Sequence, residues 1–342
     1  MPIDAVLHSI HLRRKKNAVV FRNIDRLWDL ARTAQSHQDL LDGLHPWNAS
    51  TTLKFENTLP IFLAGFGFLQ MLSLIIAPAN IWFQLNFGMG CFMLFWAYLV
   101  YETKQPIQDV ILHLEETALS KKYALQFDQQ PQYLNVKFNT LQFIGHLKRL
   151  FPIFDRGTLS NEINRFASTV WEDESGQKHD LVIFQYHYID ELQIRDKNGD
   201  RVTVKEIHKD LWGVFVFNIE TQGLAVTTNN RKFYYPYTSP WHSSDIQANQ
   251  RLKFYGTDSL QTAKMMSPGF VLRLTEFFHD RQGDLLFHPE QRVMCYLGPH
   301  DLFKVSSRQK QITDISTLRG HLRTFKLAEL ERLQSALLTF LK

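Results

Sequence analysis

Two long apolar blocks constrain this chain more than any other feature. They cover residues 59–77 and 81–101, and only Pro78, Ala79 and Asn80 separate them. Neither block contains Asp, Glu, Lys or Arg. At a rise of ~1.5 Å per residue, about 20 apolar helical residues cross the ~30 Å hydrocarbon core of a bilayer. The pattern therefore predicts a transmembrane helical hairpin.

Small residues predict how the two helices of this hairpin meet. Gly65 and Gly67 lie in the first block, and Gly88 and Gly90 lie in the second. They would let two helix backbones approach closely, although neither block has the strict GxxxG spacing.

Basic residues near the block ends predict the orientation. Lys54 precedes the first block, Lys104, Lys121 and Lys122 follow the second, and the connecting turn has none. Because Lys and Arg resist translocation, both termini are expected to be cytoplasmic. No short apolar region with a cleavage site precedes the first block, so a cleaved signal peptide is not expected. The chain is predicted to be a multi-pass protein of the cytoplasmic membrane.

Length and charge predict the remaining organisation. The 342 residues are expected to divide into an N-terminal cytoplasmic helical segment (1–58), the hairpin (59–101), a cytoplasmic helical connector (102–150) and a soluble α+β domain (151–342). The net charge of +4 is spread along the chain, which excludes the positive excess of a nucleic-acid binder. Cys91 and Cys295 lie in different parts and are not expected to pair.

Apolar periodicity predicts helices on both sides of the hairpin. An amphipathic N-terminal helix is expected over residues 18–44, a second helix from Pro106, and a third over 141–150. A long amphipathic C-terminal helix is expected over 316–341, with a shift of its apolar stripe between Phe325 and Leu330.

The second half of the chain predicts a mostly antiparallel sheet with flanking helices. Strands are expected over residues 181–189, 201–207, 212–220, 224–228, 252–255, 285–287 and 293–297. Asn198 and Gly199 predict a tight hairpin turn because both accept positive φ. Asp258 and Ser267 are expected to cap two short helices.

Two motifs in this half resemble a known family. They are Leu252-Lys253-Phe254-Tyr255-Gly256-Thr257-Asp258, with Ser267-Pro268 and Phe270-Val271-Leu272-Arg273-Leu274 beyond it, and Leu211-Trp212-Gly213-Val214-Phe215-Val216-Phe217. With the two apolar blocks, they resemble the bacterial Domain of Unknown Function 3137 family over the hairpin and most of residues 151–300. The family often has Phe where Leu211 stands and Ala where Thr262 stands. The resemblance implies an inner-membrane protein of unassigned biochemistry, associated with LemA-type membrane proteins, and supplies no catalytic residues.

An aromatic loop and a basic run are the candidate contact sites. Tyr235, Tyr237 and Trp241 lie in a loop-like region and are candidate partner contacts. The alternative, which we favour, is that this loop simply covers one open face of the sheet. Arg13-Arg14-Lys15-Lys16 is a candidate contact for anionic lipid headgroups. The alternative for this run is a solvated helix face.

No recognisable catalytic, phosphate-binding or metal-binding motif occurs in the sequence. The nearest metal candidates are His8 with His11, and His187 with Asp190 and Glu191. Flanked by two tyrosines, His187 is interpreted instead as a hydrogen-bonded sheet residue. We therefore predict no catalytic site, no metal and no cofactor.

These observations favour a non-enzymatic, membrane-anchored cytoplasmic interaction or scaffold protein. Its predicted partners are the lipid bilayer and another membrane or membrane-associated protein, not nucleic acid. One alternative is a ligand-sensing protein with a pocket between the sheet and the helix at residues 267–278. Another is an enzyme that acts on a lipid or lipid-linked substrate near the membrane surface.

Overall fold

The computed structural model describes residues 15–45, 51–73, 81–129, 140–195, 202–219, 223–229, 236–307 and 311–340. The chain forms two compact units. Unit 1 comprises Met1–Lys122 and Ser307–Phe325, and unit 2 comprises Tyr123–Ser306 and Lys326–Lys342. This grouping differs from the predicted segments, because the connector is divided and part of the C-terminal region joins unit 1.

Unit 1 is helical in its described part. Its helices are α2 (Lys15–Thr33), α3 (His37–Gly43), α4 (Thr58–Ser73), α5 (Ile81–Val100), α6 (Gln105–Tyr123) and α11 (Ile315–Thr324). The predicted helix over 18–44 is interrupted before α3 by a capping box: Ser36 Oγ accepts from the Asp39 amide at 3.0 Å, and Asp39 accepts from the Ser36 amide at 2.9 Å.

The predicted transmembrane hairpin is wrong. In the part of the chain that the structure describes, no helix combines the length and the apolarity needed to cross a membrane. The predicted multi-pass location in the cytoplasmic membrane, with both termini cytoplasmic, is contradicted by the same finding.

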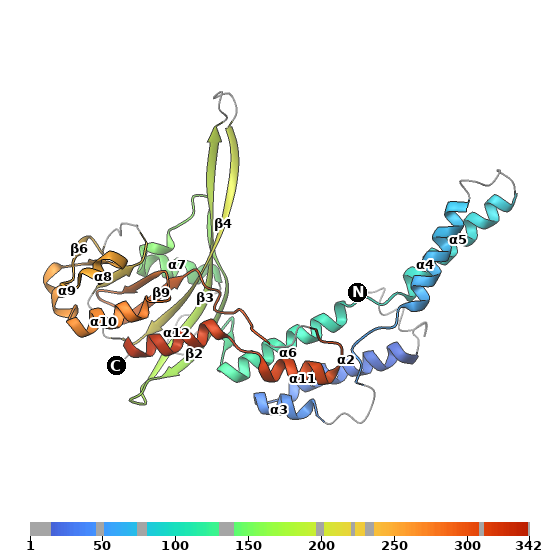
Figure 1. Cartoon of the computed structure of the whole chain (residues 1–342), viewed down its shortest axis with the longest axis horizontal. Helices are drawn as coiled ribbons and strands as arrows, with labels where there is room; N and C mark the ends of the chain where they lie inside the picture. Colours follow the sequence, from blue (N-terminus) through green and yellow to red (C-terminus); the bar gives the residue numbers. More distant parts are fainter. Residues whose placement is uncertain are drawn as a thin grey trace. The chain divides into compact units, whose positions relative to one another are not determined.

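Unit 2 contains a nine-stranded sheet among its described residues (Figure 1). The strands are β1 (Gln126–Phe127), β2 (Ser160–Glu172), β3 (Lys178–Arg195), β4 (Val202–Phe217), β5 (Leu224–Thr227), β6 (Ser239–Trp241), β7 (Lys253–Gly256), β8 (Asp284–Phe287) and β9 (Val293–Gly298). Their order is β1-β2-β3-β4-β9-β8-β5-β7-β6, and every pair is antiparallel. The α+β class with an antiparallel sheet is confirmed, but the strands expected over 201–207 and 212–220 are one continuous strand, β4.

Helices cover both faces of the sheet's centre. On one face, α7 (Thr140–Leu150) and the 3-10 turn η1 (Pro152–Phe154) pack in a core with Phe184, Phe215 and Leu286. On the other face, Phe277 of α10 (Pro268–Phe277) lies 5.4 Å, ring to ring, from Tyr296. All side chains of β5, β8 and β9 are buried in consequence.

Local signals define the shorter helices of unit 2. The helices α8 (Ile246–Arg251), α9 (Ser259–Met265) and α12 (Ala328–Leu337) complete its described part. Asp258 caps α9 and Ser267 caps α10, as predicted. The single C-terminal helix predicted over 316–341 is wrong: α11 and α12 are separated where Lys326 exchanges backbone hydrogen bonds with Ser306 at 2.9 Å. This break coincides with the shift of the apolar stripe.

We expect Phe277→Ala to lower the free energy of unfolding by about 3–5 kcal/mol, because it removes a ring packed between the sheet and the C-terminal 3-10 turn η2 (Leu338–Phe340). Urea unfolding followed by near-UV circular dichroism measures this. The matched control is Leu272→Ala on the same helix, where the side chain is 56% exposed. Equal effects of the two substitutions would contradict the packing described for α10.

Candidate functional site

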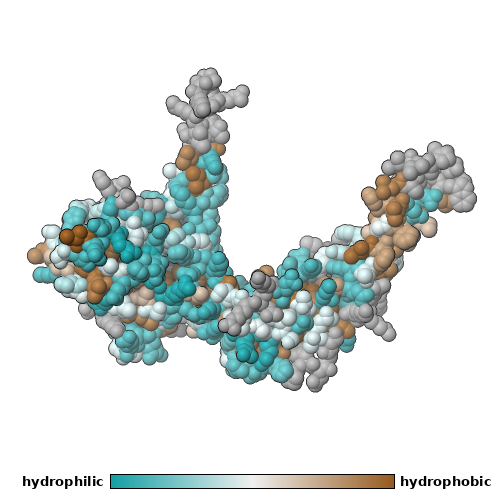
Figure 2. All heavy atoms as spheres, in the orientation of Figure 1, coloured by the Kyte–Doolittle hydropathy of each residue, from teal (hydrophilic) through white to brown (hydrophobic). Residues whose placement is uncertain are grey.

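The most extensive exposed apolar surface in the described structure lies on α4 and α5. Figure 2 shows it as brown spheres over these helices. Its side chains are 42–71% exposed: Ile61, Phe62, Phe66, Phe68, Leu69 and Leu72 on α4, and Leu85, Phe87, Met89, Phe92, Phe95 and Tyr98 on α5. We call α4 and α5 with these side chains the apolar hairpin. Soluble monomers rarely expose a contiguous apolar surface of this kind, which makes it the candidate interaction surface of the described structure.

The two helices of the apolar hairpin meet through glycine. A Cβ atom on Gly67 would lie 3.0 Å from the Gly90 carbonyl oxygen, whereas Gly65 and Gly88 face open space. The predicted close approach is thus confirmed at Gly67 and Gly90. At the base, the Asn57 side chain donates to the Glu102 carbonyl at 2.7 Å and accepts from the Glu102 amide at 3.1 Å. The helices therefore pair through small groups and leave the large side chains outside.

A two-stranded ribbon extends from the sheet of unit 2. The pairing of β2 with β3 ends at Ile189, and that of β9 with β4 begins only at Trp212. Beyond these points β3 and β4 pair only with each other among the described strands (Figure 1). We call residues 190–195 and 202–207 the ribbon. Its exposed apolar side chains include Leu192 and Val204.

Histidines from both strands meet where the ribbon leaves the sheet. His187 Nδ1 lies 2.9 Å from Asp210 Oδ1, and His187 Nε2 lies 3.3 Å from His208 Nδ1. Gln185 Nε2 also donates to Asp210 Oδ1, at 3.0 Å. The other ring nitrogen of His208 lies 3.7 Å from Glu206 Oε2. We call His187, His208, Asp210 and Glu206 the histidine cluster.

The structure does not form the metal candidates named from the sequence. Asp190 lies on the opposite face of β3 from His187, where it pairs with Lys209 Nζ at 2.9 Å. The His8 and His11 pair lies outside the described residues. Within the described ranges, no group of three or more His, Cys, Asp and Glu side chains is placed to hold a metal ion.

The histidine cluster was missed because its members are far apart in sequence, yet a signal for it exists. The two-residue turn that the sequence predicts at Asn198-Gly199 would pair position 197 with 200 and therefore 187 with 210. This is the observed register, in which His187 faces Asp210.

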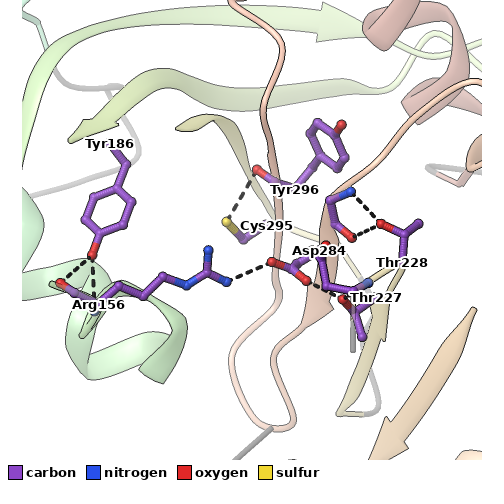
Figure 3. A network of polar contacts seen from close by, with 9 residues as sticks. Arg156, Tyr186, Thr227, Thr228, Asp284, Cys295 and Tyr296 are labelled. Carbon is purple, nitrogen blue, oxygen red and sulfur yellow. Dashed lines mark hydrogen bonds and ion pairs between the residues drawn. The ribbon is translucent and has the colours of Figure 1, made fainter. Parts of the chain in front are cut away.

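A second network of polar side chains lies in the core of unit 2 and holds elements of the fold together (Figure 3). Arg156 Nη2 donates to Asp284 Oδ2 at 2.8 Å, and Thr227 Oγ1 donates to Asp284 Oδ1 at 2.5 Å. The Asp284 side chain is 2% exposed, so both of its oxygens are satisfied inside the protein. Burial raises the pKa of the nearby Cys295 thiol well above its usual value, which disfavours the reactive thiolate. The network joins the loop after η1 to β5 and β8.

A shallow depression of about 280 Å³ on α2 is lined by Asp25, Trp28, Asp29 and Arg32. The pocket suggested between the sheet and residues 267–278 is occupied by packed rings. Phe270 lies 6.0 Å from Phe287, and Phe277 packs on Tyr296.

The candidate contact residues differ in their burial, and several lie outside the described residues. Tyr237 is fully buried and donates its hydroxyl hydrogen to the Phe287 carbonyl at 3.0 Å, so it covers the sheet instead of facing a partner. Trp241 is half-buried on β6, with its ring 5.9 Å from that of Phe254. Three others, Tyr235, Arg13 and Arg14, lie outside the described residues. Lys15 and Lys16 begin α2, but their side chains are outside the description.

No protein-family model, curated protein or solved structure matches this chain. The resemblance to the Domain of Unknown Function 3137 family, and the LemA-type association that it implies, stay predictions.

Arg156→Ala is expected to lower the free energy of unfolding by about 3–5 kcal/mol, because it leaves the Asp284 carboxylate buried without its partner. Adding Asp284→Asn should restore part of this loss by removing the charge. Lys148→Ala serves as the control, since its partner Asp155 is 78% exposed and such pairs contribute only ~0–1 kcal/mol. Denaturant unfolding of the wild type, the two single variants and the double variant measures these free energies. Equal decreases for Arg156→Ala and Lys148→Ala would contradict a larger stabilisation by the buried pair than by the exposed one.

Proposed function

We propose that this protein is a lipid-attached interaction protein. In this proposal, the apolar hairpin buries its side chains in the hydrocarbon layer of a lipid bilayer, and unit 2 binds another protein. One observation carries the proposal: the apolar hairpin exposes large apolar side chains on both helices and has no charged residue in either. The proposal concerns burial of side chains in lipid and involves no helix that crosses the bilayer.

The amount of exposed apolar surface supports attachment to an apolar phase. Complete burial of a Leu, Phe or Met side chain contributes roughly 1.5–3 kcal/mol. Twelve side chains that are about half exposed correspond to on the order of 10 kcal/mol. This is comparable to the whole stability of a typical domain, about 5–15 kcal/mol. The hairpin is therefore expected to be covered when the protein functions.

The distribution of these side chains favours lipid over a protein groove. On α4, Phe62, Phe66 and Leu69 follow one stripe, at positions i, i+4 and i+7. Ile61, Phe68 and Leu72 follow a second stripe about 100° away around the helix. A single groove covers one stripe of a helix, whereas a surrounding hydrocarbon layer covers both.

The proposed partner of unit 2 is another membrane or membrane-associated protein, which includes the LemA type implied by the family resemblance. The ribbon supports this part, because its two strands pair only with each other among the described strands, and a partner can add a strand at such a sheet edge. The basic run that ends at Lys15 and Lys16 is the proposed contact for anionic headgroups, at about 1 kcal/mol per charge near the surface.

We expect the full chain to float with neutral phosphatidylcholine vesicles in a density gradient. The double variant Phe66→Asp, Phe95→Asp should lose at least tenfold in vesicle affinity, because both side chains are about 60% exposed and each would place a charge in hydrocarbon. The control is Leu260→Asp, a 65% exposed side chain on α9.

Two results would refute the lipid assignment. One is flotation of the double variant at the wild-type level. The other is a wild-type chain that stays in the aqueous fraction as an oligomer, which the double variant converts to monomers in light scattering. That second result would assign the apolar hairpin to contacts between copies of the chain.

A further inference from the structure

Two facing nitrogens of the histidine cluster, His187 Nε2 and His208 Nδ1, have the spacing of two ligands of one transition-metal ion. Zinc binds imidazole nitrogens at about 2.0–2.1 Å, so two such ligands at a tetrahedral angle lie about 3.3–3.4 Å apart. The observed separation between His187 Nε2 and His208 Nδ1 is 3.3 Å. We propose that these two nitrogens bind a divalent transition-metal ion such as Zn²⁺, with water molecules in the remaining positions.

Asp210 prepares His187 for this role. Its Oδ1 atom lies 2.9 Å from His187 Nδ1, which places the ring hydrogen on Nδ1 and leaves Nε2 free to bind a metal. The Asp210 carboxylate can only accept a hydrogen bond, so it selects the His187 tautomer with the hydrogen on Nδ1. The Gln185 amide holds the same carboxylate oxygen at 3.0 Å, and the His187 side chain is only 14% exposed. The His187 ring is therefore oriented before any metal arrives.

A second carboxylate lies behind the other ligand. Glu206 Oε2 lies 3.7 Å from His208 Nε2, the nitrogen that does not face His187. Metal binding replaces the proton between the two rings, so His208 keeps its hydrogen on Nε2, toward Glu206. At 3.7 Å this carboxylate is beyond hydrogen-bond distance, so it adds negative charge near His208, whereas Asp210 alone orients its imidazole by a hydrogen bond, at 2.9 Å.

The surrounding charge favours a cation. Glu162 of β2 is the register partner of His187, so three carboxylates flank the two imidazoles on one face of the sheet. The His208 side chain is 56% exposed, which leaves the outer coordination positions open to water. The ion would join β3 to β4 at the point where the ribbon loses its neighbouring strands.

The test is a zinc titration of the metal-stripped full chain by calorimetry, with the visible absorption of Co²⁺ as a second readout of coordination. We expect His208→Ala and His187→Ala each to weaken Zn²⁺ binding at least tenfold. Asp210→Asn should weaken it about 10- to 100-fold, because it loosens the orientation of His187. His242→Ala and His279→Ala, exposed histidines elsewhere in unit 2, are the controls and should bind zinc as wild type does.

Circular dichroism of each variant separates loss of metal from loss of fold, and the exposed His208 is the decisive position. The proposal is overturned if folded His208→Ala retains wild-type zinc affinity. It is also overturned if the wild-type chain binds no Zn²⁺ or if Co²⁺ gives a spectrum without imidazole ligands.

Discussion

Coverage of the sheet by helices on both faces is the constraint from which the rest of unit 2 follows. Because α7 and α10 pack on opposite faces, β5, β8 and β9 have no side exposed to water. Any charge in these strands must then be satisfied internally, as Asp284 is by Arg156 and Thr227. Where β3 and β4 extend past their neighbouring strands, charged and histidine side chains become tolerable, and the histidine cluster lies where this extension begins.

In the apolar hairpin, unlike in unit 2, the large apolar side chains are exposed. Its helices pair through Gly67 and Gly90, so the contact between them buries little of the large side chains. In unit 2 aromatic rings fill the space between helices and sheet, whereas on α4 and α5 they face outward. The proposed lipid attachment supplies the cover that the fold itself does not provide.

The sequence predicted those parts of the fold that depend on local chemistry. The helices at α6, α7 and α10, the caps Asp258 and Ser267, and the strands β8 and β9 follow from periodicity and capping. Three predictions about secondary structure and membrane crossing are wrong for the same reason. Each concerns a segment whose structure depends on contacts with other parts of the chain. The polar stretch around His208 predicts a break that β4 does not have. The shift of the apolar stripe between Phe325 and Leu330 does not by itself distinguish one long helix from the two helices α11 and α12. Counting apolar residues overestimates the membrane-crossing capacity of α4 and α5. The histidine cluster depends on the register of β3 with β4, which a turn predicted at Asn198-Gly199 would specify, but no single sequence motif contains the cluster.

Open strand edges on the ribbon carry a risk as well as an opportunity. A long, flat, unpaired edge can recruit identical edges and polymerise, and proteins counter this tendency by placing charges along it. On β4 the positions Lys205, Glu206, Lys209 and Asp210 are all exposed and charged. Stacking many copies edge to edge would bring these charges together repeatedly. Glu206 and Asp210, beside the proposed metal ligands, and Lys205 and Lys209 on the opposite face of β4 therefore oppose edge-to-edge pairing of this strand.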